Sequence, residues 1–195
     1  MKRNKFLNSA LDLAETLIIS FFIVMMIFTY ILNVVTIQGE SMKNTLIPGD
    51  RVIVSLFGKP ADGDIVIINA QQGYLLDSEN SVVEVSGLHK NIVKRVIAEG
   101  GQTVDIDFVR GTVSVDGKVL DEDYLKLGLT HADGGAFTGR YPVTVPENYY
   151  FVMGDNRSIS KDSRFSDVGF VSRESISGKV IMRIYPLNTF GFLES

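Results

Sequence analysis

An uncharged apolar run near the N-terminus limits the folds open to this chain more than any other feature. From Thr16 to Gly39 no residue is charged, and Leu17 to Val35 is almost wholly apolar. About 20 helical residues cross a hydrocarbon core of about 30 Å, so the run is long enough to span a membrane. We expect a transmembrane helix over residues 16–36, preceded by a separate N-terminal segment, residues 1–15.

The charges around the run predict its orientation. Lys2, Arg3 and Lys5 precede it, whereas Glu40 and Lys43 follow it as a mixed pair. The positive-inside rule then places residues 1–15 in the cytoplasm and the remainder outside the cell membrane.

A cleaved signal peptide or a buried core helix fits the run less well. A cleaved signal peptide has an apolar core of about 7–15 residues that ends at a small-x-small site. This run is longer, and residues 35–38, Val-Thr-Ile-Gln, offer no such site. A buried core helix would show a polar stripe, and the run has none. The sequence therefore favours a permanent single-pass anchor.

Composition excludes several classes of function. The 195 residues, 45% hydrophobic and 22% charged, suit one globular domain plus an appendage. Apart from the three basic residues of the N-terminal segment, 16 basic residues face 23 acidic ones, which disfavours nucleic-acid binding. The chain has no cysteine, only two histidines and no His-Glu-x-x-His motif, so we expect no metal and no cofactor.

Beyond residue 50 the pattern is that of short strands between turns. Residues 51–57, 64–69, 81–86, 91–98 and 102–108 are rich in β-branched residues or alternate. Asp116-Gly117 lies between residues 112–115 and 118–120 and predicts a hairpin. Residues 121–140 are polar and indicate a surface excursion. We therefore expect an all-β sandwich or barrel-like fold after the helix.

A serine and a lysine form a candidate catalytic pair. Ser41 lies just past the apolar run, and a serine needs an adjacent base to become a good nucleophile. Lys94 can act as that base only if its pKa falls from about 10.4 by roughly three units. Such a shift means that the charged form is destabilised by about 4 kcal/mol, which burial can supply. In a strand Lys94 shares an apolar face with Ile92 and Val96, while Arg95 on the other face needs a carboxylate partner.

These residues alone are also compatible with non-catalytic roles. From its strand alone, Lys94 fits better at a strand edge from which its amine reaches water, and a serine after a glycine is usually an ordinary loop residue. A Ser-His-Asp triad fits poorly, because position 43 is lysine where a Gly-x-Ser-x-Gly elbow needs glycine. Neither His89 nor His131 lies in a recognisable motif. Residues 154–164 form a dense polar loop with a possible Asp162–Arg164 pair, although such composition is also typical of a solvated loop.

Taken together, these stretches resemble the bacterial type I signal peptidases, serine–lysine proteases that remove signal peptides from exported proteins. The matching stretches occur in order behind the anchor: residues 39–46 (Gly-Glu-Ser-Met-Lys-Asn-Thr-Leu), 49–52, 63–66, 94–97 with Gly100-Gly101, 154–164 and 178–179. Each stretch alone is weak, but their order is specific.

The resemblance implies a role for each matched residue. Ser41 would attack the scissile carbonyl, and Lys94 would act as general base and then as general acid. Ser160 would hydrogen-bond the lysine amine, and Asp162 and Arg164 would pair to hold the loop.

It also implies a binding site around this pair. Ile37 and Val93 would line shallow pockets for small substrate side chains, and the backbone N–H of Ser41 would face the oxyanion. Two positions depart from the family pattern. Many members have proline where Asn44 stands, so the turn would be looser, and some have a helpful serine where Gly39 stands.

The resulting expectation is a membrane-bound signal peptidase, its catalytic domain outside the cytoplasm and its partners preprotein signal peptides and the lipid bilayer. Residues 37–103 and 148–195 would form the catalytic β core, and 104–147 a smaller inserted β-domain. A self-cleaving repressor would instead be soluble and carry a helical DNA-binding domain. The alternative from another class is a catalytically dispensable, membrane-anchored assembly or chaperone factor for surface-protein export.

Overall fold

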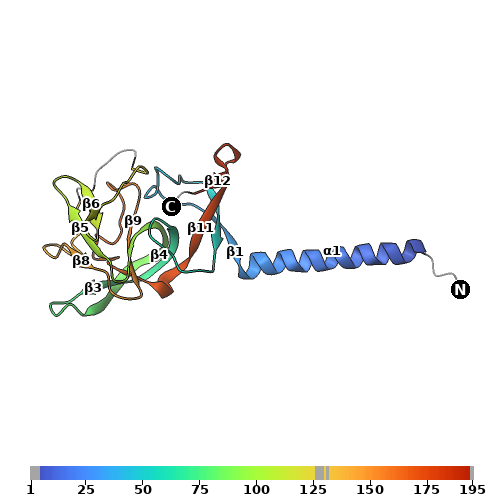
Figure 1. Cartoon of the computed structure of the whole chain (residues 1–195), viewed down its shortest axis with the longest axis horizontal. Coiled ribbons are helices and arrows are strands. Elements are labelled where there is room, and N and C mark those ends of the chain that lie inside the picture. The colour runs from blue at the N-terminus through green and yellow to red at the C-terminus, as the bar shows by residue number, and fades with distance from the viewer. Residues whose placement is uncertain (1–4, 126–129, 131, 194–195) are drawn as a thin grey trace.

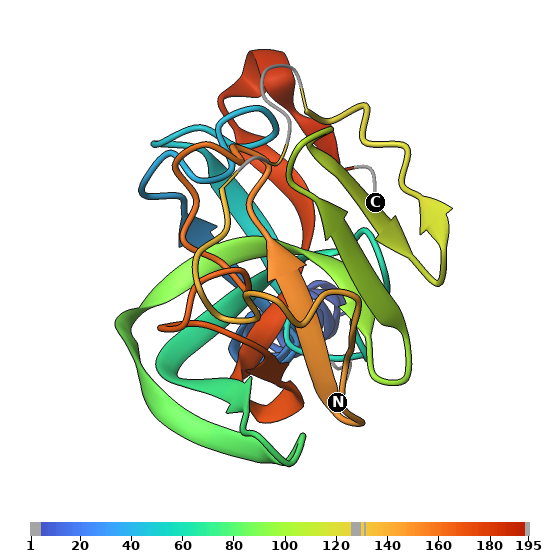
Figure 2. The same cartoon turned by 90° about the vertical axis from the view of Figure 1, so that its left-hand side faces the viewer.

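A long N-terminal helix and a β body make up the molecule. The computed structural model describes residues 5–125, 130 and 132–193. Helix α1 (Lys5–Tyr30) projects away from the β body (Figure 1), and the view along its axis shows it behind that body (Figure 2). The predicted mainly β fold with one N-terminal apolar helix is confirmed.

The helix ends earlier than the sequence suggested. Ser9–Tyr30 is long and apolar enough to cross a membrane, and none of that span is buried by the protein. After Tyr30 the chain enters β1 (Leu32–Thr36), which pairs antiparallel with β2 (Arg51–Ser55). The helix expected over residues 16–36 is therefore too long at its C-terminal end, because its last residues are largely β-branched and find a partner strand. Lys2 and Arg3 lie outside the described residues.

The main sheet is antiparallel and contains eight strands. Its order is β1-β2-β11-β3-β4-β9-β10, and β12 pairs with β11. The remaining strands of this sheet are β3 (Ile65–Leu76), β4 (Val82–Glu99), β9 (Tyr149–Met153), β10 (Val171–Ser172), β11 (Ile176–Tyr185) and β12 (Gly191–Phe192). Two short 3-10 helices, η1 (Arg173–Ser175) and η2 (Leu187–Thr189), flank β11.

Strands β3 and β4 form one long hairpin, where the sequence predicted several short strands. An irregularity between Ala70 and Gln72 interrupts their register, which explains the break in the sequence pattern. The hairpin places Lys94 opposite Val66 in the interior of the sheet.

A second sheet lies mostly within the segment expected to form the inserted domain, residues 104–147, and begins one residue earlier, at Thr103. It has the order β7-β6-β5-β8, with β5 (Thr103–Asp107), β6 (Thr112–Val115), β7 (Lys118–Val119) and β8 (Val143–Thr144). Asp116 and Gly117 turn the β6–β7 hairpin at φ of 50° and 77°, as a type I′ turn requires, so the predicted hairpin is confirmed.

The second sheet does not have a core to itself. Val104 and Val113 from this sheet share one buried cluster with Phe151 and Phe170, which belong to the main sheet or its loops. A separate domain over residues 104–147 therefore stays a prediction.

A smaller buried cluster anchors the chain after β1. Ile37, Met42 and Leu46 are almost inaccessible and pack with Val52 and Val54 of β2. Met42 and Leu46 flank the segment that follows Ser41, so burial of these apolar side chains fixes that segment against the sheet.

Candidate active site

The structure brings Ser41 and Lys94 together. The Nζ of Lys94 lies 2.8 Å from the Oγ of Ser41 and donates a hydrogen bond to it, although the two residues are 53 positions apart. Ser41 belongs to a tight turn after β1, whereas Lys94 projects from β4. This is the distance at which a base can take the hydroxyl proton.

Burial disfavours the positively charged form of the Lys94 amine. The residue is 2% exposed, and Ile92 and Val96, on the same strand face, belong to the apolar core. Loss of hydration lowers its pKa from 10.5 to about 8, opposed by the Asp162 carboxylate and assisted by the positive charge of Lys90. A usable fraction of the amine is then neutral near neutral pH.

Arg95 lies on the other face of β4 and is fully paired. Its Nε and Nη2 donate to the two carboxylate oxygens of Asp155 at 3.0 and 2.8 Å, and its Nη1 donates to the carbonyl of Gly63 at 2.7 Å. The guanidinium also lies 4.1 Å from the ring centre of Tyr124. Asp155 is thus the carboxylate that the sequence required for this buried cation.

Residues 40–46, here called the Ser41 turn, are held to residues 154–164, the Gly154 loop. The backbone N–H of Asn156 donates to the carbonyl of Ser41 at 2.9 Å. The Asn44 amide donates to the carbonyl of Asp155 at 3.0 Å, and the Thr45 hydroxyl donates to the Asp155 carboxylate. The turn is therefore not left loose by the absence of proline, because the Asn44 side chain ties it to the loop.

The backbone N–H of Ser41 is available as a donor. Among the residues that the structure describes, no acceptor is paired with it. Gly39 stands two residues earlier at φ of 82°, a left-handed conformation that glycine adopts readily. An N–H without an internal acceptor, next to a nucleophile, suits a developing oxyanion.

A buried ion pair fixes the Gly154 loop. The guanidinium of Arg164 donates to both carboxylate oxygens of Asp162 at 2.8 and 2.9 Å, and neither side chain is exposed. The same carboxylate accepts the backbone N–H of Gly154 at 3.0 Å. The pair therefore sets the conformation of the loop that contacts the Ser41 turn.

Ser160 lies in this loop but does not make the contact expected of it. Its side chain is buried, and its Oγ has no hydrogen-bond partner within the described part of the chain, Lys94 included. The Oγ packs so closely against Gly154 that a Cβ added there would clash with it. An assisting role for this hydroxyl stays a prediction.

Ile37 and Val93 come together in the apolar cluster beneath the turn. Ile37 is 2% exposed and Val93 is partly buried against the same cluster. The structure therefore brings together both residues expected to line substrate pockets, but their contact with a substrate stays a prediction.

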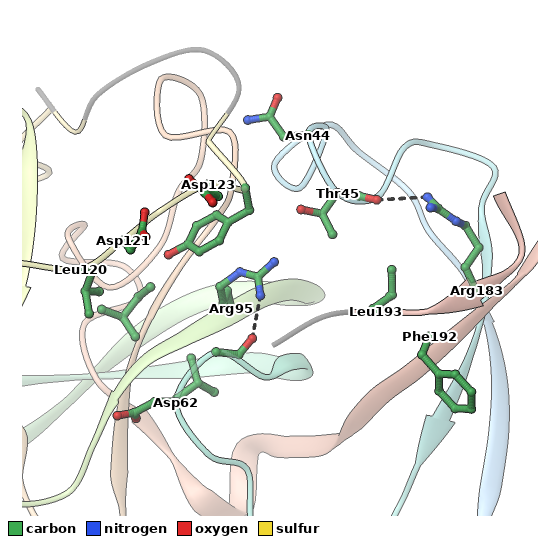
Figure 3. Close-up of a pocket in the computed structure, with 14 residues that line it drawn as sticks. Asn44, Thr45, Asp62, Arg95, Leu120, Asp121, Asp123, Arg183, Phe192 and Leu193 are labelled. Carbon is green, nitrogen blue, oxygen red and sulfur yellow. Dashed lines mark hydrogen bonds between the residues drawn. The ribbon is translucent and has the colours of Figure 1, made fainter.

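One arginine near the site was not anticipated. A cavity of about 720 Å³ lies beside the Ser41 turn and is lined by Asn44, Thr45, Arg95 and Arg183, among others (Figure 3). Arg183 comes from β11, far along the chain, and donates to the carbonyl of Thr45. No local sequence pattern links a single strand arginine to a turn 138 residues away.

Comparison with known proteins identifies the family of this chain. Residues 10–185 match the family described as "Signal peptidase, peptidase S26". Signal peptidase IB of Staphylococcus aureus (strain MRSA252) is 34% identical over 185 residues, 89% of this chain and 88% of that protein. The probable signal peptidase I-2 of Synechocystis sp. is 30% identical over 190 residues, 95% of this chain and 78% of that protein.

Among solved structures, a signal peptidase I from Enterococcus faecalis V583 is similar at 30% identity, covering 63% of this chain and 97% of that one. The TM-score of that match is 0.45, too low to add to the sequence matches.

Proposed function

This chain belongs to the signal peptidase family, peptidase S26, which removes signal peptides, and from that premise we propose that Ser41 is its nucleophile and Lys94 its general base. The observation that carries the proposal is the 2.8 Å approach of a buried lysine amine to the serine hydroxyl. Burial disfavours the ammonium, so the neutral amine can accept the proton.

The first half of the reaction follows from these positions. The neutral Nζ of Lys94 takes the proton of Ser41 while the Oγ bonds to the scissile carbonyl carbon. The backbone N–H of Ser41 donates to the oxygen that becomes negative. The Lys94 ammonium then returns the proton to the leaving nitrogen as the C–N bond breaks, releasing the mature protein with a free N-terminus and leaving the signal peptide as an ester on Ser41.

The second half uses the same base. Lys94, again neutral, takes a proton from a water that attacks the ester carbonyl. Collapse of the intermediate breaks the bond to the Ser41 Oγ, which recovers its proton from Lys94. The signal peptide leaves as a carboxylic acid, and the pair is ready for another cycle.

The surrounding residues are proposed to support these steps. Asp162 and Arg164 hold the loop that faces the Ser41 turn. Ser160 lies in that loop, and its buried hydroxyl, which has no partner among the described residues, is proposed to orient the Lys94 amine when substrate is bound. Ile37 and Val93 accept side chains of the substrate on the N-terminal side of the cut. Packed side chains lie behind this apolar surface, so the pockets are shallow and only small side chains fit.

The helix α1 is proposed to cross the cell membrane. Its apolar side chains are exposed all along Ser9–Tyr30, and such a surface is stable only in lipid. Leu56 lies next to the helix end, because its backbone N–H donates to the carbonyl of Ile31, and the side chains of Leu56 and Phe57 are exposed. No more than about 40 Å of extended chain separates Tyr30 from Ser41, so cleavage takes place close to the bilayer.

The N-terminus is proposed to be cytoplasmic and the β body extracytoplasmic. The native chain has no cysteine, so single cysteines introduced before α1 and at exposed Lys118 can be labelled in intact cells. A membrane-impermeant maleimide is expected to label the Lys118→Cys protein only. Labelling of the N-terminal cysteine alone would reverse the orientation.

Cleavage of a preprotein tests the catalytic proposal. The full chain in lipid vesicles is expected to release a mature protein whose N-terminus starts at the signal-peptide junction. Ser41→Ala and Lys94→Ala are expected to remove all measurable cleavage, while Lys118→Ala, on an exposed strand of the second sheet, retains it. Equal processing by all four proteins would reject the pair and favour an assembly or chaperone factor.

A further inference from the structure

Arg183 makes three contacts from one guanidinium. Its Nη1 donates to the carbonyl of Thr45 at 3.0 Å and to the carboxylate of Asp50 at 2.9 Å. Its Nε donates to the carbonyl of Thr189 at 2.9 Å, at the end of η2. One side chain therefore joins the C-terminal hairpin to the segment that carries Ser41.

The Asp50 carboxylate requires this cation. Asp50 is 1% exposed, and its Oδ2 accepts the backbone N–H of Ile47 at 3.1 Å as well as the bond from Arg183. A buried carboxylate without a cation is strongly disfavoured. Arg183, whose side chain is 18% exposed, is thus fixed in place by a charge that lies just after the Ser41 turn.

Thr45 is held from two directions. Its hydroxyl donates to the Asp155 carboxylate, which Arg95 neutralises, and its carbonyl accepts from Arg183. Figure 3 shows Arg95 and Arg183 on different sides of Thr45, with the bond from Arg183 to the Thr45 carbonyl. The Thr45 N–H donates to the carbonyl of Met42 at 2.8 Å, so a movement of Thr45 is passed directly to the residue after Ser41.

We propose that Arg183 is a positioning residue that holds the Ser41 turn in the conformation needed for attack on the substrate. This inference rests on the proposed role of Ser41 as nucleophile. Arg183 touches neither of the proposed reacting groups and acts through Thr45. Loss of its bond allows the turn to shift away from Lys94, and a shift of about 1 Å in a reacting atom can reduce the rate about a hundredfold.

Three variants separate positioning from stability. Arg183→Met removes all three bonds and leaves the Asp50 charge buried, so we expect lower thermal stability and a kcat reduced about 10- to 100-fold with KM nearly unchanged. Asp50→Asn/Arg183→Met removes that charge as well and is expected to recover stability but not kcat. Arg183→Lys keeps a cation beside Asp50 and is expected to remain stable with an intermediate kcat.

Arg140 provides a matched control. It also donates to backbone carbonyls, those of Leu76 and Asp77, but it lies on an exposed loop, and within the described ranges no hydrogen bond joins its side chain to the Ser41 turn. Arg140→Met is expected to keep the wild-type kcat. The midpoint of the pH profile should stay unchanged in the Arg183 variants, because the inference concerns position and not the charge of Lys94.

The result that would overturn the inference is a kcat that recovers together with stability in Asp50→Asn/Arg183→Met, or wild-type kcat in all Arg183 variants. The Ser41→Ala protein is measured in the same assay. Activity of Ser41→Ala would reject the proposed function itself, whereas an inactive Ser41→Ala beside fully active Arg183 variants would reject only the role of Arg183.

Discussion

Raising the pH is expected to increase the rate of cleavage, because Lys94 loses its proton and becomes a base. With a pKa of about 8, roughly 1% of this amine is neutral at pH 6, about 10% at pH 7 and about 90% at pH 9. If the neutral form is the base, kcat/KM rises roughly 90-fold over that range and then levels off. A lysine with the ordinary pKa of about 10.4 would still give a tenfold rise per pH unit at pH 9.

The assay is cleavage of an internally quenched peptide that has small residues before the cut and no ionisable side chain. The full chain is measured in detergent across pH 5 to 10 at substrate concentrations well below KM, so the profile reports the free enzyme. Lys90→Gln removes a positive charge that lowers the Lys94 pKa and is expected to move the midpoint upward. Lys118→Gln, on the second sheet, is expected to leave it in place. A flat profile would refute the lysine base.

The lowered pKa of Lys94 must also make the free energy of unfolding depend on pH. The folded-state pKa of Lys94, about 8, lies below the ordinary value of 10.5, so the unfolded chain binds more protons between these values and stability rises with pH across that window. The contribution of Lys94 amounts to roughly 3 kcal/mol, so the free energy of unfolding of the wild type is expected to gain that much on Lys94→Met over the window. Denaturant unfolding of both proteins from pH 7 to 10.5 checks this, and parallel curves would contradict a pKa lowered by burial.

Three further substitutions test the packing around the turn. Gly154→Ala places a Cβ about 2.5 Å from the carbonyl of Ser41, so peptide cleavage is expected to fall at least tenfold while the fold persists by circular dichroism. Asn44→Ala removes the amide bond to the Gly154 loop and is expected to lower kcat several-fold and stability by about 1 kcal/mol in urea unfolding. Asp162→Ala leaves Arg164 buried without its carboxylate and is expected to cost about 3–5 kcal/mol in the same measurement, whereas a loss below about 1 kcal/mol would mean that the pair is dispensable.

The sequence predicts much of this architecture because its signals are local. The apolar run, the alternation in the strands and Asp116-Gly117 each specify a nearby element without help from distant residues. The apolar face around Lys94 likewise follows from alternation within one strand.

The remaining features depend on contacts that local patterns do not contain. An apolar run has the same sequence pattern whether it lies in lipid or in a sheet. The end of α1 at Tyr30 therefore follows only from the pairing of β1 with β2. The second sheet shares its core with the first, which a change of composition along the chain does not reveal. Arg183 acquires its importance from Thr45 and Asp50, more than 130 residues earlier.

The most direct test of the Ser41–Lys94 pair is the identity of the atom that receives the signal peptide. A peptide substrate mixed rapidly with the full chain, quenched in acid and digested, can be searched by mass spectrometry for an ester on the fragment that contains Ser41. We expect that ester in the wild-type protein and neither ester nor cleavage in Ser41→Ala or Lys94→Ala. An adduct on any other residue, or continued cleavage by Ser41→Ala, would contradict the assignment of Ser41 as nucleophile.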